Sequence, residues 1–127
     1  MSKKPSEHIS EFLNFVTEAR TQHKLYSEEV AKQDKLTQDY LHSLEFDGLK
    51  CDERSKIATK LAINRKDRRY FKNRVEDLRP IVELFEKPQA KEVLNAMTKA
   101  LGETRKSENY HKFGKYVPRV LKEKKDE

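Results

Sequence analysis

A chain of 127 residues is long enough for one domain with a modest core, and its single cysteine excludes an internal disulfide. Hydrophobic residues make up 35% of the chain and charged residues 39%, against about 45–50% and about 25% in typical soluble domains, so elongated helices suit the composition better than a compact globule. The net charge of +6 is concentrated in residues 51–79, where ten basic side chains stand against five acidic ones, which indicates a local basic patch.

Residues 1–5 are expected to form a flexible N-terminus, and the first helix is predicted to begin near Ser6, a plausible N-cap, and to run towards Glu45. Such a helix would be roughly 60 Å long. A stripe at alternating spacings of three and four indicates its buried face: Ile9, Phe12, Val16, Ala19, His23, Tyr26 and Val30, continued by Gln33, Thr37, Tyr40 and Leu44. Asp47-Gly48 should end this helix, and Asp52 is the expected cap of the next.

The second helix is predicted from about Glu53 towards Leu78 or on to Glu86, with a kink or break near Pro80. Its buried stripe is Ile57, Leu61, Asn64, Arg68, Phe71, Val75, Leu78, Val82 and Phe85.

A third helix should begin at Lys87-Pro88 and fade between Ser107 and Lys112. Its expected inner face is Val93, Leu94, Met97, Ala100, Leu101 and Thr104. Residues 6–112 would then form one helical bundle domain. Residues 113–127 would form a basic, partly disordered tail, in which Phe113, Tyr116, Val117 and Val120 could cover part of the bundle.

The first two stripes contain polar interruptions that would meet in an antiparallel hairpin. If the chain folds back through residues 47–52, the numbers of facing residues should sum to about 98. Gln33 and Asp34 then lie beside Asn64 and Arg68, which predicts a buried polar layer that can fix the register. We expect Arg68 to pair with Asp34, and the equally weighted alternative is that Arg68 extends outwards into water.

The strongest binding signal is the run RKDRRYFKNR at residues 65–74. At 100° per residue, Phe71 and Arg68 belong to the buried stripe, whereas Lys66, Tyr70 and Arg74 point elsewhere. A row of basic side chains borders the core: Arg54, Arg65, Arg69, Lys72 and Arg79.

Three interpretations of this row compete. It is most simply a solvated face, or one paired with acids of the first and third helices. It could instead follow the phosphates of a nucleic acid without reading the base sequence, or bind an acidic protein partner.

We find no catalytic motif and expect neither a metal nor a cofactor. The four histidines, His8, His23, His42 and His111, lack metal-ligand spacing. Cys51 has no evident basic partner and is expected to be a part-buried, inert thiol. No apolar run approaches the length of a membrane span or a signal peptide, so we expect a cytoplasmic protein.

The segments DKLTQDYLHSLE (34–45), KIATKLA (56–62) and RKDRRYFK (65–72) resemble small helical proteins encoded by phages and prophages of Gram-positive bacteria. The resemblance covers about Phe12 to Arg119. Because most of these proteins have no assigned activity, it implies no catalytic or binding residue. It does imply an accessory role, such as binding phage or host nucleoprotein complexes or blocking a host defence protein.

The sequence therefore predicts an all-α fold, a long antiparallel helical hairpin with a third helix packed at one end. We expect a non-enzymatic protein that binds a protein partner in the host cytoplasm. The alternative is a non-specific nucleic-acid-binding accessory protein. A homodimer is also expected, because the third helix is too short to cover hairpin arms of roughly 60 Å.

Overall fold

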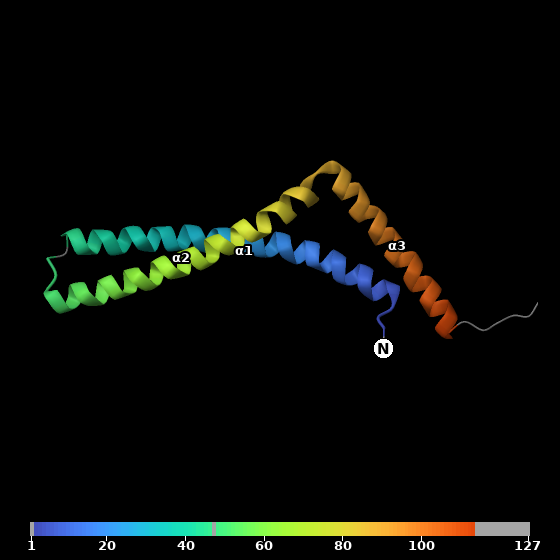
Figure 1. Cartoon of the computed structure of the whole chain (residues 1–127), viewed down its shortest axis with the longest axis horizontal. Helices are drawn as coiled ribbons and strands as arrows, with labels where there is room; N and C mark the ends of the chain where they lie inside the picture. Colours follow the sequence, from blue (N-terminus) through green and yellow to red (C-terminus); the bar gives the residue numbers. More distant parts are fainter. Residues whose placement is uncertain (1, 47, 114–127) are drawn as a thin grey trace, which may run out of the picture.

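Three helices form nearly all of the structure, a computed structural model that describes residues 2–46 and 48–113 apart from the side chain of Phe46. They are α1 (Pro5–Phe46), α2 (Cys51–Glu86) and α3 (Pro88–Phe113). Helices α1 and α2 form a long antiparallel hairpin, and α3 returns from the end of α2 towards the start of α1 (Figure 1). The fold is all-α, as predicted, and α1 packs mainly against α2.

Helix α1 begins at Pro5, one residue before the predicted cap. Proline suits this first helical position because its fixed φ matches the helix and its missing N–H needs no partner. The backbone N–H of Lys4 donates to the Glu7 carboxylate at 3.3 Å, and the Lys4 carbonyl accepts from the N–H groups of Glu7 and His8 at 3.0 and 3.3 Å. Ser6 is therefore inside the helix, and its prediction as the N-cap was wrong.

The turn between α1 and α2 uses a glycine where one is needed. Gly48 has a φ of +54°, in the left-handed region that costs glycine little. The extended residue before α2 is Lys50, and no side chain caps this helix. The predicted cap at Asp52 was wrong, because α2 begins one residue earlier and Asp52 stands in its first turn, where a negative charge interacts favourably with the helix dipole.

Pro80 does not break α2, which continues to Glu86. Pro80 leaves the Glu76 carbonyl without its helical donor, but the buried side chains of Leu78 and Val82 on either side hold the helix in the core. The last turns of α2 diverge from α1 before α3 turns back (Figure 1). At this junction the Lys87 N–H donates to the Leu84 carbonyl at 3.3 Å.

The core lies where the three helices meet, and its buried apolar residues are Val16, Ala19, Val75, Leu78, Val82 and Leu101. Phe12 and Phe85 meet edge to face, with ring centroids 5.8 Å apart. The predicted inner face of α3 was too wide, because Val93 is 57% exposed and Ala100 is also exposed. Helix α3 diverges from the hairpin (Figure 1), so a narrower face built on Leu94, Met97 and Leu101 packs inwards.

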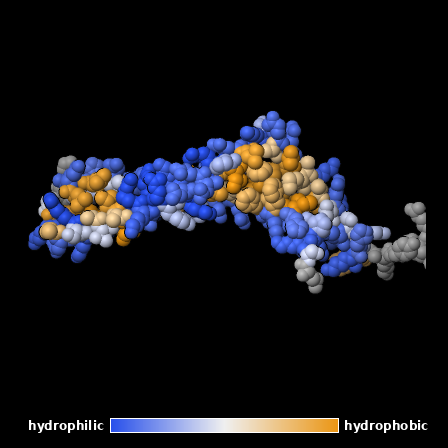
Figure 2. Space-filling view, viewed as in Figure 1, coloured by the Kyte–Doolittle hydropathy of each residue, from blue (hydrophilic) through white to orange (hydrophobic). Residues whose placement is uncertain are grey.

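Apolar surface gathers near the turn of the hairpin and around the junction of α2 and α3, with a hydrophilic stretch between them (Figure 2). At the end where α3 joins the hairpin, Phe15, Leu84 and Val93 are among the exposed large apolar residues. Phe113 is the last residue of α3 and is 73% exposed, so its predicted role in covering the bundle was wrong. The other predicted tail anchors, Tyr116, Val117 and Val120, lie outside the described residues.

Candidate binding edge

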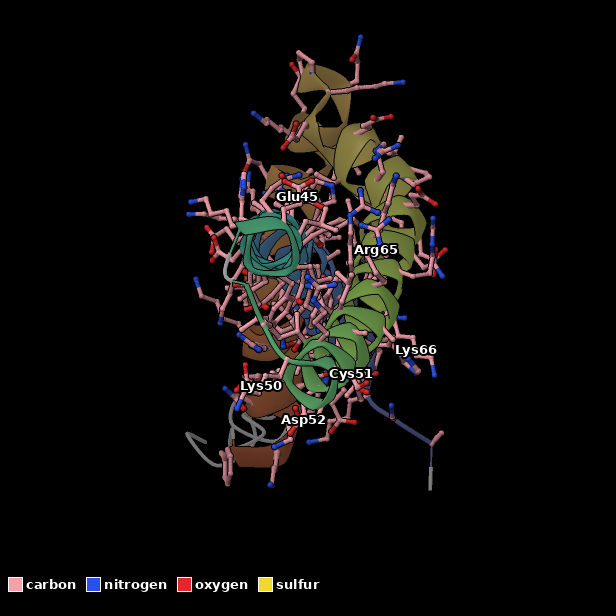
Figure 3. The ribbon with its side chains drawn as sticks, turned by 90° about the vertical axis from the view of Figure 1, so that its left-hand side faces the viewer. Glu45, Lys50, Cys51, Asp52, Arg65 and Lys66 are labelled. Carbon is pink, nitrogen blue, oxygen red and sulfur yellow. The ribbon has the colours of Figure 1, made fainter. Side chains whose placement is uncertain are left out.

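The basic side chains of residues 65–74 point to different sides of α2, because this segment is helical. Arg65 lies on the same side of the hairpin as Glu45 of α1, whereas Lys66 points away from α1 (Figure 3). Successive members of the predicted row are eleven, four, three and seven residues apart. At 100° per residue, these spacings place them all on the same side of α2 as Arg65. We call this row the basic edge: Arg54, Arg65, Arg69, Lys72 and Arg79.

Four of the five side chains of the basic edge are exposed to solvent. Arg54, Arg65, Arg69 and Arg79 are exposed, and Lys72 is half-buried. From Arg54 to Arg79 the edge is about 37 Å long at 1.5 Å per residue.

None of these five cations is paired within residues 2–46 and 48–113. The ion pairs in this part of the chain are Lys3–Glu11 and Arg68–Asp34. The acids of α1 and α3 therefore do not neutralise the basic edge through direct contacts. This observation removes pairing with the neighbouring helices as an explanation of the row. A solvated face and a surface that binds an external anion are the two interpretations left.

Two acids interrupt the same side of α2. Glu76 follows Lys72 by four residues, and Glu83 follows Arg79 by four, so both continue the row. Both are exposed. The edge is thus strongly cationic from Arg54 to Lys72 and mixed in charge beyond it.

A polar layer joins the two arms of the hairpin beside the basic edge. Asn64 is 4% exposed, and its amide nitrogen donates to the Gln33 side-chain oxygen at 2.7 Å and to the Gln33 carbonyl at 2.9 Å. The Thr37 hydroxyl donates to the Asn64 side-chain oxygen at 2.6 Å. Because every polar atom of the Asn64 side chain has a partner, this layer avoids the cost of a buried unpaired group.

Arg68 and Asp34 form the outer part of this layer. The Arg68 Nε donates to the Asp34 carboxylate, and the two side chains are 19% and 51% exposed. Arg68 therefore does not simply extend into water. Since one partner is half in solvent, the pair should contribute under about 1 kcal/mol to stability.

A second polar contact closes the opposite end of the molecule, and the sequence reasoning missed it. The backbone N–H of Ser6 donates to the Glu108 carboxylate at 3.2 Å, and the Ser6 hydroxyl donates to its other oxygen at 2.5 Å. The Ser6 hydroxyl bond, assisted by the backbone bond and nearby Lys4 and Arg105, lowers the pKa of Glu108 below its ordinary value despite partial desolvation. Arg105 also donates to Ser10 at 3.4 Å. The sequence did contain one signal for this contact. Pro5 marks the start of a helix, and a helix N-terminus attracts a carboxylate.

Arg20 makes another contact between helices that sequence reasoning missed. Its Nη2 donates to the Phe85 carbonyl at 2.7 Å, near the end of α2. The position of Arg20, four residues after Val16 and next to Ala19, was a signal that it borders the buried stripe.

The remaining candidates for chemistry are solvent-facing. Cys51 is the first residue of α2 and is exposed, so the prediction of a part-buried thiol was wrong. His111 lines a shallow depression with Lys4, Pro5, Glu108 and Lys112, where the Glu108 carboxylate already accepts from Ser6.

Within the described part of the chain, no three His, Cys, Asp or Glu side chains come together as a possible metal site. None of its helices has the length and apolar character needed to cross a membrane. Comparison of the chain with protein-family models, with curated proteins and with solved structures gives no match.

Proposed function

We propose that this chain is a non-enzymatic accessory protein that binds a protein partner through its basic edge. The observation that carries the proposal is the row itself, in which Arg54, Arg65, Arg69 and Arg79 are exposed and have no ion-pair partner among the described residues. Unpaired guanidinium groups on a rigid helix are suited to carboxylates, which they can bind in a bidentate manner. The absence of a catalytic motif in the sequence is the reason for proposing a binding role.

The mixed charge at one end of the edge favours a protein partner. Glu76 and Glu83 lie on the same side of α2 as Lys72 and Arg79, and they would repel a continuous line of phosphates. A protein surface can place its own Lys or Arg opposite these acids, and such complementary charges orient a partner and speed association.

The alternative is non-specific binding of nucleic acid, and the length of the edge supports it. Five basic side chains spread over about 37 Å of helix could follow a phosphate backbone. If all five neutralised phosphates of duplex DNA, the slope of log K against log salt concentration would be about −4.5.

We further propose that this accessory protein is of phage or prophage type and inhibits a host defence factor. This proposal rests on the sequence resemblance of residues 34–45, 56–62 and 65–72. On this proposal the protein acts in the cytoplasm of the host cell.

We also propose a homodimer. Helix α1 has 42 residues and is therefore about 63 Å long, and α3 packs at one end of the hairpin (Figure 1). Both broad faces of the hairpin near its turn are left without a covering helix in the single chain.

The test compares the protein with its variant R65E/R69E/K72E in pull-downs from a nuclease-treated lysate of a Gram-positive bacterium. A matched control, K91E/K99E/K106E, reverses three exposed lysines of α3 and changes the net charge equally. We expect a defined protein to be recovered with the wild type and the control, and to be lost with R65E/R69E/K72E.

A parallel band-shift assay at low salt decides the alternative. A shift of DNA or RNA that R65E/R69E/K72E abolishes and the control retains, without a recovered protein, would favour nucleic-acid binding. If recovery of the protein partner is the same for all three chains, the basic edge is not the binding surface.

A further inference from the structure

The hairpin has an apolar strip on the face away from the basic edge. Ile63 lies about 160° around α2 from Arg65 at 100° per residue, and it is 54% exposed. Tyr70 on α2 and Leu25 on α1 are 57% and 53% exposed. A shallow groove between the helices places Leu36 and Tyr40 of α1 beside Ile63. Large apolar side chains gathered on one face of a chain this polar indicate a contact surface.

Several charged and aromatic residues around this strip lie at equal sequence distances before and after Ile63. Asp52 precedes Ile63 by eleven residues and Arg74 follows it by eleven. Lys56 precedes it by seven and Tyr70 follows it by seven.

The two charged residues that line the groove beside Ile63 continue this pattern. Lys60 precedes Ile63 by three residues and Asp67 follows it by four, so this pair matches to within one residue, a rise of about 1.5 Å. On this face, Lys56 thus has an aromatic ring at the matching position, and Lys60 has an acid within one residue of it.

This pattern is what an antiparallel pair of identical helices requires. In a two-fold contact centred on Ile63, each residue before the centre meets the residue at the same distance after it in the second copy. Asp52 would meet the second copy's Arg74, and Lys56 would lie over its Tyr70. Lys60 would lie within about 1.5 Å along the helix of the position opposite the second copy's Asp67, close enough for an ion pair. A parallel pair would instead place Lys60 against Lys60 and Asp67 against Asp67.

Four of the charged side chains concerned are exposed, and the fifth, Arg74, is half-buried. Asp52, Lys56, Lys60 and Asp67 are exposed and have no hydrogen-bond or ion-pair partner within the described residues. Arg74 is half-buried over the Tyr26 ring, 5.8 Å from its centroid. Helix α3 lies at the other end of the hairpin (Figure 1), so it does not cover this face.

We propose that two copies of the chain pair through this face, with α2 antiparallel to α2 of the second copy and the two-fold axis at Ile63. This inference deepens the proposed homodimer and leaves the basic edges of both copies free. The segment from Asp52 to Arg74 is about 33 Å long and two adjacent helices are about 20 Å wide, so the contact would bury about 1,300 Å² in total, within the range of stable interfaces.

Disulfide cross-linking locates the axis. In the variant C51S/I63C the two thiols face each other across the two-fold axis, so oxidation should produce a covalent dimer. Native Cys51 should not cross-link, because the two Cys51 residues would lie about 36 Å apart, far beyond disulfide reach. The control C51S/R69C carries its thiol on the basic edge and should also remain monomeric on a denaturing gel. Failure of C51S/I63C to cross-link overturns the proposal.

Charge exchange tests the register. Sedimentation should show a dimer for the wild type at micromolar concentration, and D67K should weaken dimerisation at least about tenfold by opposing Lys60. The double variant K60D/D67K should restore the Kd to within about threefold. A monomeric wild type, or a dimer that D67K does not weaken, overturns the proposal.

These tests of dimerisation are independent of partner binding through the basic edge. R65E/R69E/K72E should keep the dimer while losing the partner, and D67K should show the reverse.

Discussion

At the scale of single residues, Asn64 and Arg68 show how burial decides the importance of a polar contact. Both bridge α1 and α2. Asn64 is buried and its side chain makes three hydrogen bonds, whereas Arg68 pairs with a carboxylate that is half exposed. Loss of a buried partner leaves an unsatisfied group that costs about 1–3 kcal/mol, while an ion pair near the surface contributes under about 1 kcal/mol.

Asn64→Ala should therefore lower the free energy of unfolding by about 1–3 kcal/mol, because it leaves the Gln33 side-chain oxygen buried without its donor. Asp34→Ala should lower it by under about 1 kcal/mol. Urea unfolding followed by circular dichroism measures both. Asn73→Ala, at an exposed position of the same helix, is the control. An Asp34 variant less stable than the Asn64 variant would contradict this ranking.

At the scale of the elements, two glycines of the same chain have opposite effects on the helices. Gly48 has a φ of +54° after α1, in the left-handed region. Gly102 lies inside α3, and its φ is not positive. A Cβ at either position would meet no atom within 4 Å. Backbone conformation, and not packing, therefore decides the effect of a substitution.

Gly48→Ala should destabilise the hairpin by about 1–2 kcal/mol, because an L-residue is strained in the left-handed region. Gly102→Ala should stabilise α3 by about 0.5–1 kcal/mol, because alanine loses less backbone entropy in a helix. Thermal unfolding of the two variants side by side checks this. Shifts of the same sign would show that the turn does not depend on the conformation of Gly48.

The elements of the hairpin were largely predictable because their signals are local. Gly48 and Pro88 mark the ends of helices, and the breaks in the two stripes at Gln33 and Asn64 set the register. The position of α3 depends on its direction after Lys87, for which the sequence has no periodic signal. The contact between Ser6 and Glu108 and the exposure of Val93 follow from that direction, so neither was predicted.

The basic edge was predictable as a row, because side-chain direction on a helix follows from spacing alone. Whether acids of α1 or α3 neutralise Arg65 or Arg69 depends on side-chain positions across helices. That question required the structure.

At the scale of the whole molecule, Glu108 ties the far end of α3 to the start of α1. Its carboxylate accepts both hydrogen bonds from Ser6, and the core residue Leu101 lies between this contact and the junction at Lys87. The three helices thus form a closed triangle at this end (Figure 1). Without the Ser6 contact, α3 would be held mainly by its first turns and its narrow apolar face.

The lowered pKa of Glu108 predicts a pH-dependent attachment of α3. A carboxyl whose folded pKa is below its unfolded value stabilises the fold above the unfolded value, about 4.3, and the contribution is lost as pH falls through the folded pKa. Hydrogen-exchange protection of residues 94–108 should therefore be constant from neutral pH to about pH 5 and fall below it.

Glu108→Gln should show reduced protection at neutral pH and a weaker acid-induced loss, since the neutral amide cannot titrate. The Lys3–Glu11 pair, which lowers the pKa of Glu11, is left intact as an internal control near the start of α1. An identical acid-induced loss in wild type and Glu108→Gln would show that another group holds α3.

The basic edge is central to this account, and the amount of partner protein recovered by equal amounts of wild type and R65E/R69E/K72E tests it most directly. Three reversed charges at a binding surface should reduce recovery at least about tenfold, while K91E/K99E/K106E recovers the wild-type amount. Equal recovery by all three proteins would contradict the assignment of the basic edge as the binding surface.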